Sequence, residues 1–173
     1  MKIIYFLIFI SLFSISCLSD NSRITSNVKN EIAKKILEDQ FDSRQEDAKA
    51  FNIIYFYIQI DGHDPDQDLI NYLQNSYKQI IKPYSQSIDV WDDTTKYIRY
   101  RKSEVITVLD KETKQNGVRF YIEYKSAKYE NNYLRVKAWN RAGGGFAWGC
   151  YYVLEKGGDK KWKILRREEE WVS

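Results

Sequence analysis

Residues 118–139, VRFYIEYKSAKYENNYLRVKAW, decide the fold that the sequence predicts. Every second residue is apolar over 118–124 and again over 134–138, with charged or aromatic residues between. A period of two places one side of a strand in the core and the other toward solvent. Asn131-Asn132 lies between the two runs and favours a tight turn. The stretch therefore predicts an antiparallel hairpin with one buried face.

Further strands flank this hairpin on both sides. We expect strands over 97–109, 146–155 and 162–171, with loops at 141–145 and 157–160. Together these segments give five consecutive strands. Upstream, FNIIYFYIQI at 51–60 is β-branched and aromatic, which indicates one more buried strand.

Two helices are predicted before the hairpin. Apolar residues recur at helical spacing over 28–41, and 42–49 is then a charged connection. A second helix over 65–82 begins with Asp64 as its N-cap and Pro65 at its first position, and Pro83 ends it. Helices followed by a run of strands predict an α+β class. We expect two helices packed on a curved, mainly antiparallel sheet of about five to six strands, in one domain over 27–173.

The N-terminus is typical of an exported protein. After Lys2 comes an apolar run at 3–16 that is too short for a permanent membrane span. Ser14-Ile15-Ser16-Cys17 resembles the lipobox of bacterial lipoproteins, although Ser14 stands where leucine is commonest. The resemblance implies a signal peptide at 1–16, lipid attachment at Cys17, a polar tether at 17–26, and a membrane-anchored protein of the bacterial cell envelope, in the outer membrane or facing the periplasm. The alternative is a secreted protein with a Cys17–Cys150 disulfide.

A second resemblance concerns the domain itself. YYVLEKGGDKKWKILRREEEWVS at 151–173 and FYIQIDGHDPDQDLINYL at 56–73 resemble segments of nuclear-transport-factor-2-like domains in small bacterial lipoproteins. The resemblance implies a cone-like α+β domain and assigns no activity. The strand between the two predicted helices departs from the usual order of that family.

Acidic residues cluster around the chain's one histidine, and they allow two interpretations. The residues are Asp61, His63, Asp64, Asp66 and Asp68. A calcium loop needs a glycine at its sixth position and a glutamate at its twelfth, and a zinc site needs further His or Cys ligands. Neither pattern is present here. The order Asp64-Pro65-Asp66-Gln67 is instead typical of a helix start, so we predict a structural role and no metal ligands.

Three further groups also favour structural interpretations. The glycine loop Arg141–Gly145 runs into a strand, whereas a phosphate-binding loop runs into a helix. Cys150 and His63 lack the sequence context of a nucleophile and its base, and Arg166–Glu170 alternates as cross-strand ion pairs do. The sequence therefore predicts no catalytic residue and no cofactor.

The charge pattern limits the partners. The formal net charge is +3, spread over alternating signs, so we expect no nucleic-acid partner. The favoured function is a non-catalytic domain that binds a small molecule or an envelope protein. The alternatives are an enzyme of the ketosteroid-isomerase-like kind, which needs a carboxylate in an apolar cavity, and an inhibitor or immunity protein, which needs an aromatic patch outside that cavity.

Overall fold

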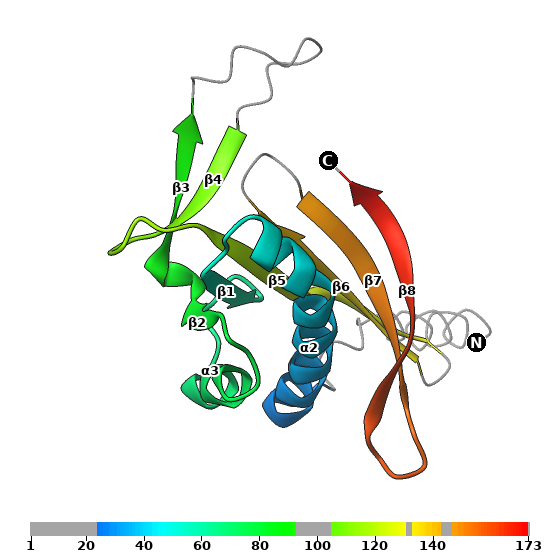
Figure 1. Cartoon of the computed structure of the whole chain (residues 1–173). Coiled ribbons are helices and arrows are strands. Elements are labelled where there is room, and N and C mark those ends of the chain that lie inside the picture. Colours follow the sequence, from blue (N-terminus) through cyan, green and yellow to red (C-terminus); the bar gives the residue numbers. More distant parts are fainter. Residues whose placement is uncertain (1–23, 93–104, 131–132, 143–146, 173) are drawn as a thin grey trace, which may run out of the picture.

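The computed structural model describes residues 24–92, 105–130, 133–142 and 147–172. Figure 1 shows the helices lying on one face of a sheet. Helix α2 spans Ser26–Ala50 and helix α3 spans Gln67–Gln74. No described helix is long and apolar enough to cross a membrane.

The main sheet has six strands in the order β2-β1-β5-β6-β7-β8. Their bounds are β1 Tyr55–Ile60, β2 Ile80–Pro83, β5 Gly117–Glu130, β6 Tyr133–Arg141, β7 Ala147–Lys156 and β8 Trp162–Val172. Strand β1 runs parallel to both β2 and β5, whereas β5 to β8 form an antiparallel meander. The sheet is therefore mixed.

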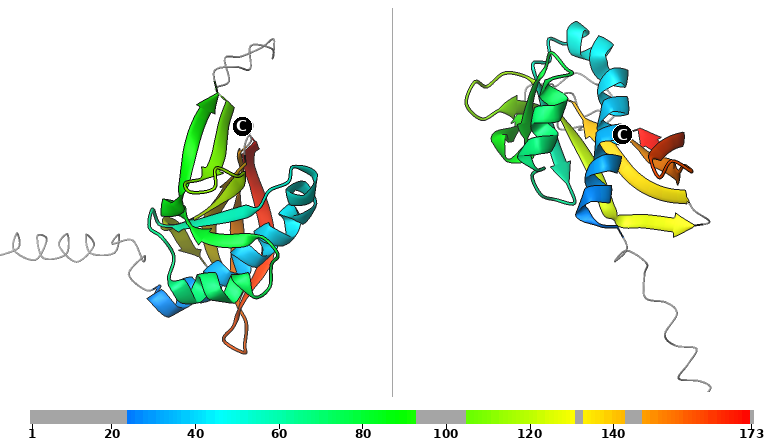
Figure 2. Two further views of the ribbon diagram at one scale, coloured as in Figure 1. Left: turned by 60° about the vertical axis from the view of Figure 1, so that its left-hand side comes forward. Right: turned by 90° about the horizontal axis from the view of Figure 1, so that it is seen from below.

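A second sheet of two strands extends from the first. The short 3₁₀ helix η2, Tyr84–Gln86, leads into β3, Ser87–Asp92, which pairs antiparallel with β4, Val105–Asp110. We call β3 and β4 the arm. Figure 1 shows the arm rising from the end of the main sheet, and Figure 2 shows it from two further directions.

The core lies between the two helices and the main sheet. Its members come from every strand of that sheet and from both helices, so α2 and α3 cover the same face. On β5 and β6 the predicted inward residues of 118–124 and 134–138 are at most 2% exposed, which confirms the alternation. The opposite face, which we call the outer face, carries the residues between them.

Both predicted helices have different bounds in the structure. Helix α2 continues through 42–49, which is no loop, because Ala48 packs in the core. The second helix ends at Gln74 rather than 82, and 80–83 form β2. The Gln74 side chain binds the backbone that follows the helix: it accepts a hydrogen bond from the Ile81 amide and donates to the carbonyls of Tyr77 and Gln79. A short apolar pair such as Ile80-Ile81 fits a helix or a strand equally well.

The α+β class is confirmed, but the strand count and pairing differ from the prediction. The described residues contain eight strands, and the parallel β2-β1-β5 part makes the main sheet mixed. Strand 51–60 begins at Tyr55, β3 was not predicted, and β4 pairs with β3 instead of extending the meander. Several predictions lie outside the described residues: the signal peptide 1–16, Cys17, most of the tether, the strand over 97–104, and the turns at 131–132 and 143–145.

Candidate functional site

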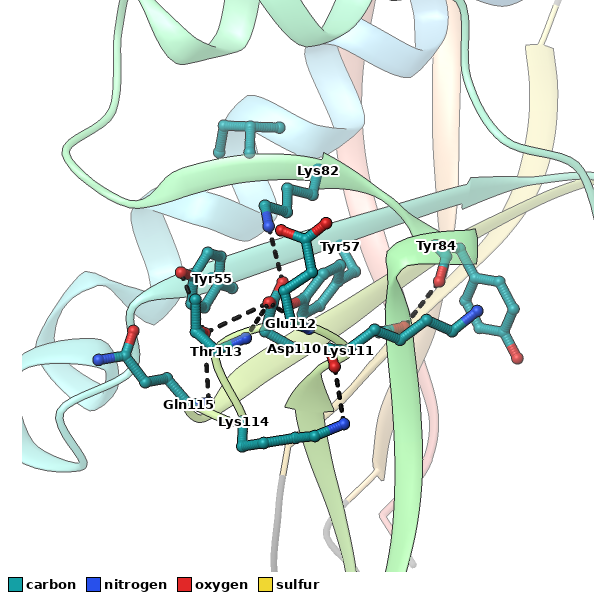
Figure 3. A network of polar contacts seen from close by, with 12 residues as sticks. Tyr55, Tyr57, Lys82, Tyr84, Asp110, Lys111, Glu112, Thr113, Lys114 and Gln115 are labelled. Atoms are coloured by element: carbon teal, nitrogen blue, oxygen red, sulfur yellow. Dashed lines mark hydrogen bonds and ion pairs between the residues drawn. The ribbon is translucent and has the colours of Figure 1, made fainter.

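A buried carboxylate joins the arm to the main sheet. Asp110, at the end of β4, is fully buried. Its Oδ2 accepts hydrogen bonds from the Tyr57 hydroxyl on β1 and the Lys82 ammonium on β2, both at 2.8 Å. Its Oδ1 accepts from the backbone amides of Glu112 and Thr113 at 3.0 and 2.9 Å and from the Thr113 hydroxyl. Figure 3 shows these groups converging on Asp110, and we call them the Asp110 joint.

The Asp110 joint is electrostatically unsuited to proton transfer. Burial acts to raise the pKa of Asp110, but the hydrogen bonds from Lys82, the Thr113 amide and Tyr57 outweigh it and hold the pKa well below its usual range. Burial and the Asp110 carboxylate together raise the pKa of Tyr57 far above its usual value. The carboxylate therefore stays ionised with its lone pairs occupied, while the phenol stays protonated. A general base needs a pKa near the working pH and an open lone pair.

Asp110 is also the one fully buried carboxylate in the part of the chain that the structure describes. The ketosteroid-isomerase-like alternative requires a carboxylate among the inward residues of the main sheet, and the buried inward residues of β5 and β6 are apolar apart from the amide Asn140. Tyr57 and Asp110 lie on the outer side, where Tyr55, Tyr57 and Val108 form a small cluster of their own. The arrangement works as a structural joint.

A second ionic contact fixes the arm to β5. The guanidinium of Arg119, 3% exposed, donates to the Asp89 carboxylate at 2.6 Å and to the Ser87 hydroxyl at 2.8 Å. Its Cζ atom also lies 4.4 Å from the ring centre of Tyr84 in η2. Arg119 thus ties the start of β3 to the main sheet and holds Tyr84 above β5.

Three aromatic rings stand in sequence on the outer face, and we call them the aromatic row. Tyr84 lies 6.0 Å from Tyr121 on β5, and Tyr121 stacks on Trp139 of β6 with ring centres 4.9 Å apart and planes inclined by 8°. The stack forms because the register places Tyr121 directly opposite Trp139. Cations contact both ends, Arg119 at Tyr84 and Lys137 at Trp139, 5.6 Å from the ring centre.

The aromatic row is only partly buried, although its rings are held on several sides. Tyr84, Tyr121 and Trp139 are each of intermediate exposure, and neither α2 nor α3 covers this face. Burial raises the pKa of the Tyr121 hydroxyl, so that group stays protonated and can both donate and accept a hydrogen bond. Rigid aromatic side chains beside an arginine are the residue types that dominate binding energy in protein interfaces.

The acidic cluster at 61–68 is dispersed by the fold. Asp61 pairs with Lys29 at 3.0 Å and accepts from the backbone amides of Tyr124 and Lys125. Asp66 accepts from the Asn30 side chain. The predicted cap is wrong: the N-cap of α3 is Asp66, without a side-chain capping bond, and Asp64 accepts from the Ser85 amide. Asp61, Asp64 and Asp66 thus have different partners, and the described residues contain no metal-binding cluster.

Other predicted residues also separate. His63 makes a bridge with Ile60 at the end of β1, whereas Cys150 is buried on β7, with β5 and β6 between the two strands. The Arg166–Glu170 stretch does form ion pairs: Glu168 binds Arg135 across the sheet at 2.8 Å and Arg166 on its own strand at 3.0 Å.

Two buried amide side chains, Gln40 on α2 and Asn140 on β6, lie in the layer between the helix and the main sheet. The register sets Asn140 between Phe120 and Trp148, which contact the helix through Phe41 and Arg44 respectively. Gln40 lies one turn before Arg44 on α2, so these two side chains share one side of the helix. Within the described chain, the Gln40 Nε2 and Oε1 atoms and the Asn140 Nδ2 atom have no hydrogen-bond partner.

No family model, curated protein or solved structure matches this chain.

Proposed function

We propose that this chain is a non-catalytic binding protein of the cell envelope, anchored through a lipid on Cys17, that captures a protein partner on the aromatic row. The observation that carries the proposal is the stacked row of Tyr84, Tyr121 and Trp139 on the face that the helices leave uncovered. An aromatic patch outside the helix-covered core is what the inhibitor or immunity alternative requires.

The packing of the row supports this proposal on energetic grounds. Rings that are already stacked lose little rotamer freedom on binding, so more of the contact energy appears as affinity. Tyrosine and tryptophan also combine a large apolar surface with a polar tip, which suits a surface that alternates between solvent and a partner. When no partner is bound, the partly apolar rings of the aromatic row stay in contact with water.

The finer fold assignment is part of the same proposal. Two helices on one face of a sheet that ends in a four-stranded antiparallel meander support a nuclear-transport-factor-2-like domain. The parallel strands β2-β1-β5 and the separate arm are departures from it. Binding by such a domain needs no catalytic group, in agreement with the occupied carboxylate of Asp110.

The test is capture of the partner in the native cells with a matched pair of variants. Full-length chain, Trp139→Ala and Tyr72→Ala are cross-linked in intact cells, purified in detergent and compared by quantitative mass spectrometry. Tyr72 is a 40% exposed aromatic residue on α3, so it controls for loss of an exposed ring. We expect at least one protein to fall tenfold or more with Trp139→Ala and to persist with Tyr72→Ala. The same set of proteins in all three samples would overturn the proposal.

A further inference from the structure

We infer that the protein partner presents an acidic surface, which the outer side of the β5–β6 hairpin receives beside the aromatic row. This inference rests on the proposed function and adds the chemistry of the partner. We call the surface the cationic hairpin; its lysines and arginines are Arg119, Lys125, Lys128, Arg135, Lys137 and Arg141. Among the described side chains of β5 and β6, Glu123 is the one carboxylate on the same face, and it lies opposite Lys137.

The sheet register concentrates these cations. Arg119 lies directly opposite Arg141, and Lys128 lies directly opposite Arg135. Like charges in opposed positions repel and weaken a strand pair. Two such pairs in one hairpin indicate that the face is suited to a neighbour of the opposite charge.

Carboxylates within the chain neutralise only part of this charge. Arg119 is paired with Asp89, and Arg135 is paired with Glu168. Arg141 lies opposite Arg119 and Lys128 lies opposite Arg135. Among the side chains that the structure describes, neither Arg141 nor Lys128 has an ion-pair partner. The unpaired member of each opposed pair is therefore available to a carboxylate from outside.

Charge on the other side of the molecule has the opposite sign. Along the described helices, carboxylates outnumber cations: the acids are Glu31, Glu38, Asp39, Asp42, Glu46, Asp47 and Asp68, and the cations are Lys29, Lys34, Lys35, Arg44 and Lys49. The small net charge of the chain thus conceals a separation between the helix layer and the outer face. Such a separation orients an acidic partner toward the cationic hairpin during encounter.

The geometry of the rings favours an acidic protein over a nucleic acid or an anionic glycan. Bases and sugars bind by stacking on an open ring face. Here Tyr121 and Trp139 stack on each other at 8°, and Tyr84 and Lys137 make further contacts with them. Side chains of a protein pack equally well on ring edges, and carboxylates supply the matching charge.

The first experiment uses a defined probe. Full-length chain in neutral detergent is titrated with a fluorescein-labelled random copolymer of glutamate and tyrosine, and binding is followed by anisotropy. The test variant is Lys128→Glu/Arg141→Glu. The control, Lys78→Glu/Lys156→Glu, reverses two exposed lysines outside the cationic hairpin and changes the net charge equally.

We expect the test variant to weaken copolymer binding at least tenfold and the control to change it less than twofold. Added salt should weaken wild-type binding, because exposed charges are screened. Equal losses in the two variants would overturn the inference, since they would reflect net charge alone. So would tighter binding of heparin, of single-stranded DNA or of vesicles containing phosphatidylglycerol than of the copolymer.

The second experiment separates this inference from the proposed function. The Lys128→Glu/Arg141→Glu variant is added to the cross-linking comparison with Trp139→Ala. Loss of the same protein in both variants supports an acidic partner. Loss with Trp139→Ala alone refutes the acidic partner and leaves the proposed function standing, whereas loss with neither variant refutes both.

Discussion

Replacement of Asp110 by asparagine should destabilise the protein by about 3–5 kcal/mol, the cost of breaking a buried ion pair by removing one partner. The side-chain oxygen of asparagine can still accept from the amides of Glu112 and Thr113. Its NH₂ group, however, replaces the oxygen that accepts from Tyr57 and Lys82. Tyr57 can turn to accept, but the Lys82 ammonium, whose side chain is 18% exposed, is left facing another donor.

The pH dependence gives an independent readout of the same contact. The folded-state pKa of Asp110 is depressed, so its contribution is fully present above the unfolded-state pKa, near 4. That contribution is lost as the pH falls from there toward the folded-state pKa. The stability difference between wild type and Asp110→Asn should therefore be constant from pH 7 to about 5 and shrink below about pH 4.

Urea unfolding followed by tryptophan fluorescence measures both effects. Asp159→Asn is the control, because Asp159 is exposed in the β7–β8 turn and accepts a hydrogen bond from the Lys161 amide, which the side-chain oxygen of asparagine can also accept. Lys82→Met and the double variant complete a cycle, and we expect the two substitutions to couple by at least 1 kcal/mol. A cost below about 1 kcal/mol for Asp110→Asn at pH 7 would refute the Asp110 joint as a main support of the arm.

Three further predictions address the packing, the interior and the anchor. Gly117→Ala should cost about 1–3 kcal/mol in urea unfolding, because a Cβ there would overlap the Tyr57 ring, whereas Gly158→Ala, with no atom nearby, should cost far less. Gln40→Leu should leave stability in urea unfolding unchanged or raise it by about 1 kcal/mol, because it removes a buried amide without partners. A clear loss of stability, together with the loss of a bound small molecule from the native mass spectrum, would favour the small-molecule alternative. Cys17→Ser should abolish metabolic fatty-acid labelling and release the chain from membranes, and a wild-type chain that takes up no label would show the lipid anchor to be wrong.

The sequence predicted the meander well because its signal is local. Alternation over 118–124 and 134–138 depends only on neighbouring residues, and it identified the buried face of β5 and β6 correctly. The helix end at Gln74 was missed because it depends on a contact between that side chain and Ile81, and on pairing of β2 with β1. Propensity alone does not contain such tertiary contacts.

The Asp110 joint was missed for a related reason. Asp110 is followed by Lys111 and Glu112, a pattern typical of an exposed turn. Its burial comes from Tyr57 and Lys82, which are 53 and 28 residues away in the chain. The aromatic row could be predicted in part from the sequence. The alternation predicts that Tyr121 and Trp139 point outward, but their stacking depends on the register between β5 and β6.

The Asp110 joint and the Arg119–Asp89 ion pair together hold one end of the aromatic row in place. The Asp110 joint holds β4 against β1 and β2, and Arg119 holds the start of β3 against β5, so η2 between them is held at both sides. Tyr84, the one member of the row that is not on the main sheet, is placed by η2. Because the carboxylate of Asp110 stays ionised at any pH above about 4, this placement does not change over the ordinary range of pH. A partner that binds the row therefore meets three rings already in position, and loosening of the Asp110 joint should weaken binding through Tyr84 even though Asp110 itself is buried.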